Sequence, residues 1–320
     1  MAMKSIFVQI PAYRDLELIR TVSDCIAQSS GTLQINFGIH NCFLLNEEVD
    51  FDYPTQKWVD IRHMNSRAPE NIGLQLSRKI ANDFYRGEDY YFQIDSHTRF
   101  MKDWDVSLTK TINLYRAMGI TKPLITQYPA SYEYLEDMTE RLSPSRDIEN
   151  INFYPTRIGF HENIEQFTTT RIPSQTAMSV SPWCSYTASI SGGFVFAEGD
   201  FASITPNPKI AFWGEEPLIA MRSFTNGFDL VTPFHETIWH LYAAGRPFQY
   251  VRRHHAWNDF PDIWPELDRQ SKAEYFRIVT QREIGPFALG SVRSLDQYEE
   301  FAGLDFRTGK VTQIDLRKVH

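Results

Sequence analysis

Cysteine is scarce in this sequence, and its three occurrences, Cys25, Cys42 and Cys184, lie far apart. No Cys-x-x-Cys pair is present, so the spacing typical of zinc sites and redox dithiols is missing. An odd number also leaves one thiol over in any disulfide scheme. Both features favour a reducing compartment, with the cysteines as small buried side chains. We therefore expect a cytoplasmic protein.

Clustered basic residues and long apolar runs are lacking too. Asp and Glu outnumber Lys and Arg by 40 to 32, and the formal net charge is −8. Because clustered cations bind the nucleic-acid backbone, nucleic acid is not an expected partner. The apolar run at 5–10 is too short for a signal peptide, and no run approaches the roughly 20 residues of a membrane span. The sequence predicts a soluble chain without a transmembrane segment.

Two glycine-rich signatures of phosphate-binding loops, Gly-x-x-x-x-Gly-Lys-Ser/Thr and Gly-x-Gly-x-x-Gly, do not occur. Their absence counts against phosphoryl-transfer machinery of those kinds. The composition is that of a globular protein, with 42% hydrophobic and 22% charged residues. A length of 320 residues allows one large α/β domain or two ordinary ones.

Short apolar runs alternate with segments of helical periodicity. The predicted strands are 5–10, 33–39, 59–63, 90–94, 188–196, 229–231 and 237–241. The predicted helices are 16–26, 70–85 and 216–224, followed by a helical, aromatic tail from about residue 250. This alternation favours an α/β fold with a mostly parallel sheet flanked by helices. We predict a catalytic domain over 1–250 and a helical extension on the acceptor side over 251–320.

A polar segment at 129–185 shows little periodicity and is rich in Pro, Ser, Thr and charge. Loops of this length inside a compact domain are uncommon and are often substrate-binding lids. We expect a long loop here that contacts the acceptor, together with the aromatic tail around His254, Trp257 and Trp264.

Asp95, Ser96 and His97 directly follow the predicted strand at 90–94. Ligands of parallel sheets bind at the carboxyl ends of strands, and residues two apart there point to the same side. A carboxylate suits Mg²⁺ or Mn²⁺, and an imidazole shifts the preference toward Mn²⁺. The alternative is a turn without a ligand. His240, at another predicted strand end, is a candidate third ligand, although a lone histidine is more often structural.

Two acids, Glu215 and Glu216, follow a Trp-Gly turn and precede an apolar helix. A carboxylate beside a sugar can hold its hydroxyls, orient an acceptor or stabilise positive charge at the anomeric carbon. An interaction of Glu216 with the helix dipole is the structural alternative. Gly192 and Gly193 mark either a close approach of backbone to ligand or a strand kink.

All of these residues except His240 lie in longer segments that resemble the GlcNAc-transferase family. The segments are IPAYRD (10–15), GEDYYFQIDSHTRF (87–100), SGGFVFAEG (191–199), FWGEEPLIAMRSFTNGFDL (212–230) and GSVRSLDQYEEFAGLDF (290–306). The best-known members attach GlcNAc to hydroxyproline on a cytoplasmic ubiquitin-ligase adaptor. More loosely, the segments are similar to the polypeptide GalNAc-transferases, which have a D-x-H motif, a later His, an A-G-G strand and a W-G-G-E-N turn.

The resemblance implies a GT-A fold, a UDP-sugar donor, a divalent metal and retention of anomeric configuration. The implied metal ligands are Asp95, His97 and His240, and the implied catalytic residues are Glu216 and Glu215. The implied donor or nucleotide contacts are Pro11, Tyr13, Arg14, Asp15, Arg67, Gly73, Arg78, Asp95, Ser96, Gly192, Gly193 and Trp213. Pro217 replaces the Asn of the W-G-G-E-N turn and Glu215 replaces a Gly, which leaves the donor sugar open.

The sequence therefore predicts a metal-dependent retaining glycosyltransferase. It would move GlcNAc or a related sugar from a UDP-sugar to a hydroxyl on a protein or glycan, with Mn²⁺ favoured over Mg²⁺. A carbohydrate-binding module and a sugar-nucleotide hydrolase are the alternatives, and the oligomeric state is left open.

Overall fold

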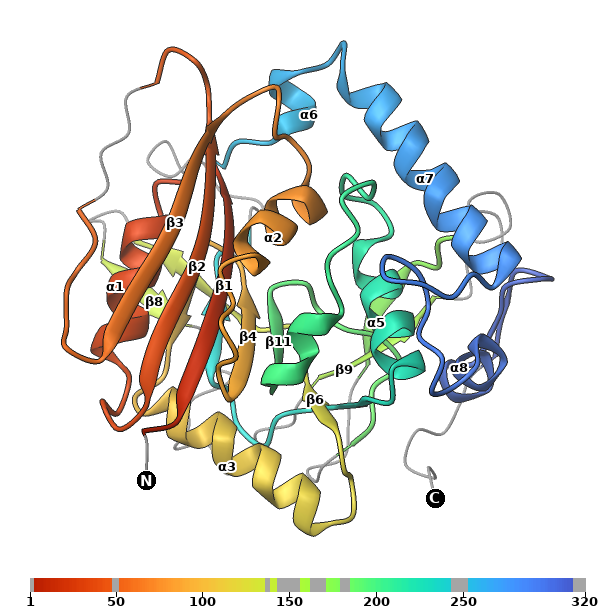
Figure 1. The fold of residues 1–320 in the computed structure, drawn as a ribbon, viewed down its shortest axis with the longest axis horizontal. Helices are drawn as coiled ribbons and strands as arrows, with labels where there is room; N and C mark the ends of the chain where they lie inside the picture. The colour runs from red at the N-terminus through yellow and green to blue at the C-terminus, as the bar shows by residue number, and fades with distance from the viewer. Residues whose placement is uncertain are drawn as a thin grey trace.

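The computed structural model describes residues 3–47, 52–135, 139–142, 156–161, 171–178, 185–242 and 253–312. Its centre is a seven-stranded sheet with the order β12-β6-β11-β4-β1-β2-β3 (Figure 1). These strands are β1 (Ser5–Tyr13), β2 (Gln34–Phe43), β3 (Val59–Arg67), β4 (Tyr90–Ile94), β6 (Pro123–Ile125), β11 (Phe194–Glu198) and β12 (Asp229–Val231). Only β11 runs antiparallel to its neighbours, β4 and β6. The predicted mixed α/β sheet is confirmed.

The strands β1, β2 and β4 are buried on both sides, because helices cover both faces of this sheet. One face packs on α1 (Leu18–Ala27) and α3 (Trp104–Ala117). The other face packs on α2 (Leu74–Asn82) and α5 (Glu215–Thr225). The α2 backbone approaches β2 so closely that a Cβ on Gly38 would lie 2.5 Å from the Ala81 carbonyl oxygen. A glycine at that position is what lets α2 dock.

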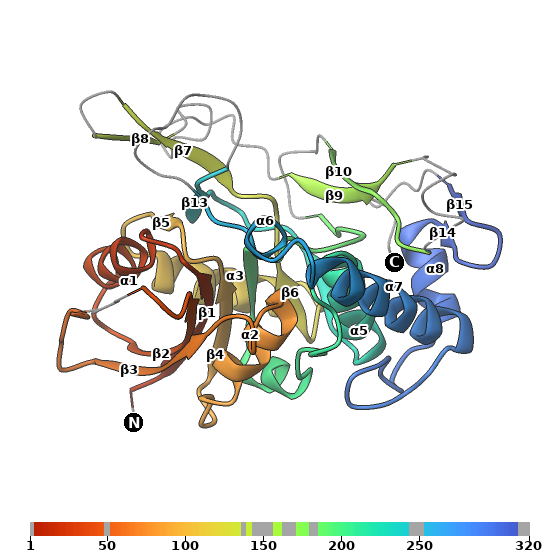
Figure 2. The same cartoon turned by 90° about the horizontal axis from the view of Figure 1, so that it is seen from above.

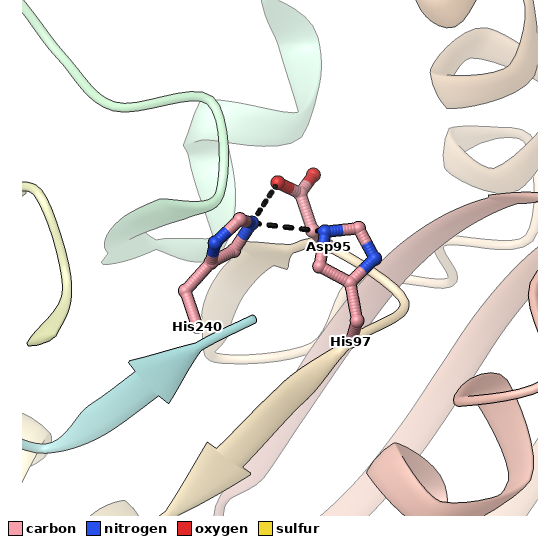
Figure 3. Close-up of side chains that lie close together, drawn as sticks. All are labelled: Asp95, His97 and His240. Carbon is pink, nitrogen blue, oxygen red and sulfur yellow. Dashed lines mark hydrogen bonds and ion pairs between the residues drawn. The ribbon is translucent and has the colours of Figure 1, made fainter. Parts of the chain in front are cut away.

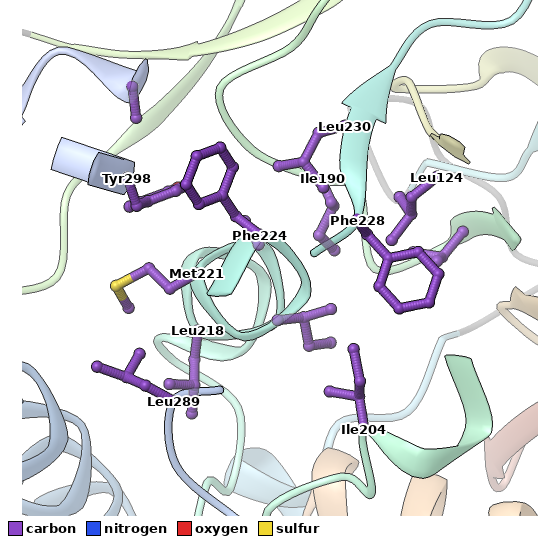
Figure 4. Close-up of a cluster of buried hydrophobic side chains, with 14 of the residues drawn as sticks. Leu124, Ile190, Ile204, Leu218, Met221, Phe224, Phe228, Leu230, Leu289 and Tyr298 are labelled. Carbon is purple, nitrogen blue, oxygen red and sulfur yellow. The ribbon is translucent and has the colours of Figure 1, made fainter. Parts of the chain in front are cut away.

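The C-terminal elements are α6 (Ala256–Asp259), α7 (Trp264–Gln281) and α8 (Leu295–Ala302), with a small hairpin of β14 (Leu304–Asp305) and β15 (Lys310–Val311). Residues of α7 and α8 join the hydrophobic core around α5, whereas Ala256 of α6 packs in a separate cluster with Cys42 and Ala211. Phe224 of α5 packs near Tyr298 of α8, and Leu218 near Leu289 (Figure 4). The helices α7 and α8 are therefore built into the main core, and the domain boundary at residue 250 stays a prediction.

Two smaller sheets lie above the main sheet in the view of Figure 2. One has the order β5-β13-β7-β8, formed by Thr98–Phe100, Ile238–His240, Ala130–Tyr134 and Glu140–Leu142. The other pairs β9 (Arg157–Phe160) with β10 (Gln175–Met178). The prediction of one long loop over 129–185 is therefore wrong for its described parts. Buried Ala130, Tyr132 and Tyr134 alternate with more exposed residues, a two-residue period that the polar composition hides.

Several predicted bounds also change. The second helix begins at Leu74, not at residue 70, because Gly73 has a φ of 123° that a helix does not admit. The strand predicted over 188–196 begins only at Phe194, so Gly192 and Gly193 lie in the turn before it. None of the helices in the described part of the chain combines the length and apolar content that crossing a bilayer requires.

Candidate active site

The pairing of two short strands brings three candidate ligands together. Asp95 directly follows β4, His97 precedes β5, and His240 ends β13, which pairs with β5 so that His240 lies opposite Thr98. The Nε2 atoms of His97 and His240 are 2.9 Å apart, and His240 Nε2 lies 3.1 Å from Asp95 Oδ2 (Figure 3). Asp95 and His97 thus lie beside His240, which is more than 140 positions later in the sequence.

The three side chains fit a divalent cation. One ligand atom from each lies within 4.8 Å of the others. Two ligands at right angles on an ion about 2.1 Å away would be about 3 Å apart, close to the spacings found here. Burial raises the pKa of Asp95, but the bond to His240 and the charge of Arg78 outweigh it, so the net shift is downward. Burial lowers the pKa of His240 to about 4. Carboxylate and neutral imidazole are the forms that bind metals.

Asp15, in the turn between β1 and α1, contacts both His97 and its neighbour Ser96. Its Oδ2 lies 2.7 Å from His97 Nδ1 and accepts a hydrogen bond of 2.6 Å from Ser96 Oγ. Burial would raise the pKa of Asp15, but His97 and Ser96 lower it to about 2. The structure therefore places this predicted nucleotide contact against a metal-ligand candidate.

Arg78 of α2 connects the metal-ligand candidates to Glu215. We call the segment of Gly214, Glu215 and Glu216 the acidic turn. Its side chain is fully buried and donates to Asp95 Oδ1 at 3.0 Å and to Glu215 Oε1 at 2.5 Å. The same guanidinium donates to the Gly192 carbonyl at 2.8 Å. Asp95 is thus held by Arg78 through one oxygen and by His240 through the other.

The acidic turn is shaped by α7. Gly214, with φ 91°, stands directly before α5, and a Cβ there would lie 2.9 Å from the Tyr275 ring. Glu216 accepts hydrogen bonds from the Gly192 N–H at 2.8 Å and from Gln175 Nε2 at 2.6 Å. Burial raises the pKa of Glu216 to about 8. This carboxyl therefore holds its proton near neutral pH.

The turn of Gly192 and Gly193 leaves space for two acidic side chains, those of Glu215 and Asp95. A Cβ on Gly193 would lie 2.8 Å from Asp95 Oδ2, closer than real Cβ atoms approach other atoms. A Cβ on Gly192 would lie 3.4 Å from Glu215 Oε2, at the edge of ordinary contact. Gly193 therefore makes room for the carboxylate of Asp95.

A cavity of about 810 Å³ opens onto all of these groups, within the usual size range of ligand pockets. The predicted site residues that line it are Pro11, Tyr13, Asp15, Gly73, Arg78, Asp95, Ser96, His97, Gly192, Gly193, Trp213, Glu215, Glu216 and His240. The lining does not include Arg14 or Arg67. Arg14 forms ion pairs with Glu47 and Asp259. Arg67 donates to the Leu44 carbonyl and lies over the Phe43 ring.

Other lining residues were not predicted from the sequence. Gln175 and Tyr128 are hydrogen-bonded to each other, and Gln175 also contacts Glu216. Arg253 and Lys272 add positive charge to the lining. No local pattern marks these residues, because strand pairing and helix packing bring them to the cavity. The expected contacts His254, Trp257 and Trp264 do line it.

Over residues 47–308, more than half of the chain, the sequence matches the family model described as Glycosyltransferase (GlcNAc). The chain therefore belongs to that family, as predicted. It is also similar to the crystal structure of GalNAc-T7 with UDP, GalNAc and Mn²⁺, at 14% identity and a TM-score of 0.44. The similarity covers 93% of this chain and 54% of that one, so this chain spans about half the length of that structure. No curated protein matches the sequence.

Proposed function

We propose that this protein is a metal-dependent, retaining glycosyltransferase of the GT-A type that uses UDP-GlcNAc or a closely related donor. The observation that supports this most is the convergence of Asp95, His97 and His240 in one cavity with Glu216. Membership of the glycosyltransferase (GlcNAc) family supports the same activity. A cytoplasmic location is part of the proposal and rests on the scarce cysteines.

The metal end of the cavity would bind the diphosphate. Asp95, His97 and His240 would hold a divalent cation, which would neutralise charge that develops on the leaving group. Two imidazoles beside one carboxylate favour Mn²⁺ over Mg²⁺. Arg253 and Lys272 line the same cavity and would add positive charge for the phosphates.

Glu216 would hold the donor sugar and the acceptor hydroxyl. Its carboxyl is fixed by Gly192 and Gln175, and its raised pKa keeps it protonated near neutral pH. A protonated carboxyl can donate a hydrogen bond to a sugar hydroxyl but is a poor nucleophile. We therefore favour attack from the face of the leaving group, where the departing phosphate takes the proton of the acceptor hydroxyl.

The acceptor would enter along an aromatic wall. Phe212 packs edge-on against both Trp213 and Trp257, and Trp257 contacts Trp264. All four line the cavity, and Trp213 is 55% exposed. Aromatic faces offer a large apolar surface to ring-shaped partners. A hydroxyl carried by a glycan or a protein fits this end of the cavity.

Release of UDP from a panel of UDP-sugars tests the proposal without an acceptor, since donor hydrolysis by water reports on the same site. The panel contains UDP-GlcNAc, UDP-GalNAc, UDP-glucose and UDP-galactose, each with Mn²⁺, with EDTA and with Asp95→Ala protein. We expect release from one of them that EDTA abolishes and that Asp95→Ala lowers at least about a hundredfold. No release, together with no Mn²⁺-dependent UDP binding, would favour a carbohydrate-binding module instead.

A further inference from the structure

We infer that Asp15 is a positioning residue of the metal site. It holds His97 in the tautomer whose Nε2 lone pair faces the point shared by the three ligand candidates. The inference rests on the proposed function, since it assigns a role within that site. It also gives Asp15 a different task from the nucleotide contact that the sequence resemblance implies.

The hydrogen bonds of Asp15 decide the tautomer. A carboxylate has no proton to donate, so Asp15 Oδ2, 2.7 Å from His97 Nδ1, must accept the proton from that nitrogen. His97 Nε2 is then left with its lone pair, and this atom lies 2.9 Å from His240 Nε2. A carboxylate that fixes the far nitrogen of a ligating histidine is the arrangement that raises ligand basicity in metal sites.

The segment that carries Asp15 also holds the backbone of the ligand turn. The Glu17 N–H donates to Asp15 Oδ1 at 3.0 Å, which fixes the carboxylate just before α1. One helical turn later, Thr21 Oγ1 donates to the Ser96 carbonyl at 2.8 Å and accepts from the Thr98 N–H at 2.9 Å. The start of α1 therefore sets both the side chain of His97 and the backbone on either side of it.

His240 has no comparable support. Its Nδ1 is buried and, among the residues that the structure describes, has no hydrogen-bond partner. Its Nε2 lies 3.1 Å from Asp95 Oδ2, which is itself a candidate ligand atom. The tautomer of His240 is therefore set only by a contact within the ligand group, whereas that of His97 is fixed from outside this group by Asp15. Loss of Asp15 would remove the support of His97 that exists before a metal binds.

Asp15→Asn tests this inference, because the amide keeps the shape of the side chain but can donate a proton to His97 Nδ1. Two readouts are needed: the tautomer of His97 in metal-free protein, from ¹⁵N-histidine NMR assigned with His97→Gln, and Mn²⁺ affinity from EPR, with and without UDP. We expect the Nδ1–H tautomer in the wild type, its loss in Asp15→Asn, and Mn²⁺ affinity lower by about 10- to 100-fold.

Asp105→Asn is the matched control. Like Asp15, Asp105 accepts hydrogen bonds from a backbone N–H and a serine hydroxyl, here both of Ser30, but it is fully buried on α3 and does not line the cavity. This variant should keep both the tautomer and the Mn²⁺ affinity of the wild type. Because the wild-type tautomer is measured without any substitution, that readout decides even if Asp15→Asn does not fold.

The outcomes separate the inference from the proposed function. An Nε2–H tautomer in the wild type, or an Asp15→Asn protein that binds Mn²⁺ within twofold of the wild type, would overturn the role of Asp15 alone. A folded wild type that shows the Nδ1–H tautomer but binds no Mn²⁺, with or without UDP, would overturn the metal site and the proposed function with it.

Discussion

The two ends of the cavity are built in different ways. At the end proposed to bind the metal, here called the metal end, Asp95, His97 and His240 stand at strand ends, and Asp15 and Arg78 fix two of them from adjacent elements. At the other end, where Glu216 is proposed to hold the donor sugar, Glu216 is held by Gln175 of β10. The turn before it packs against Tyr275 of α7, and we call this the sugar end. The metal end is therefore organised where the central sheet meets the small sheet of β5 and β13, whereas the sugar end depends on β10 and α7.

Arg78 is the connection between the two ends, and its loss should have the largest effect. Arg78→Met would leave Asp95 and Glu215 without their shared buried cation. Removing one partner of a buried ion pair typically costs about 3–5 kcal/mol of stability. We expect a loss of this size in urea unfolding, together with weaker Mn²⁺ binding. A variant as stable as the wild type would show that the two ends are not joined through Arg78.

The two neighbouring glycines offer a test that separates the ends. Gly193→Ala places a methyl group against Asp95, so the carboxylate must shift and Mn²⁺ affinity should fall by about tenfold, or roughly 1.4 kcal/mol. Gly192→Ala meets Glu215 at an ordinary contact distance and should leave Mn²⁺ affinity within about twofold. EPR titration of both variants measures this difference. Equal losses would mean that the turn acts as one unit.

The free energy of unfolding should depend on pH through the carboxyl of Glu216. Burial raises its pKa to about 8 in the folded state, so folded protein binds this proton more tightly than unfolded protein does. The stabilisation is present at acidic pH and is lost as the pH rises toward 8, on the order of 1 kcal/mol per pH unit. Glu216→Gln should remove this slope from urea unfolding between pH 5 and 8.

A matched substitution on the surface controls for the change of charge. Glu300 of α8 is exposed, so Glu300→Gln should keep the wild-type slope. If Glu216→Gln also keeps it, the carboxyl of Glu216 is ionised in the folded protein and the proposed hydrogen bond to the sugar is wrong.

The smallest effect is expected at Arg67. The sequence resemblance implies a donor contact for both Arg67 and Arg78, but only Arg78 lines the cavity. Arg67→Met removes hydrogen bonds to the carbonyls of Leu44 and Glu47 and a contact with the Phe43 ring. We expect a loss of about 1 kcal/mol in stability and no change in Mn²⁺ affinity or UDP release. A tenfold loss of UDP release would show that Arg67 reaches the donor.

The sequence predicts the metal end better than the sugar end, for a physical reason. Asp95 follows an apolar strand that neighbouring residues alone are enough to predict. Its place at a strand end could therefore be predicted from the sequence. The position of His240 beside it comes from the pairing of β13 with β5. The sequence predicts a strand end at His240, but this pairing leaves no local signal. Gln175 reaches Glu216 from β10, which pairs with β9 in a segment for which the sequence predicts a loop. Long-range packing of this kind leaves no periodic signal in the sequence.

Pulsed EPR on Mn²⁺ bound with UDP, using protein with ¹⁵N-labelled histidine, tests the central claim most directly. Two directly coordinated imidazole nitrogens are expected in the wild type, and one in each of His97→Gln and His240→Gln. Tightly bound Mn²⁺ without any histidine coupling in the wild type would contradict the metal site of Asp95, His97 and His240 on which the proposed function depends.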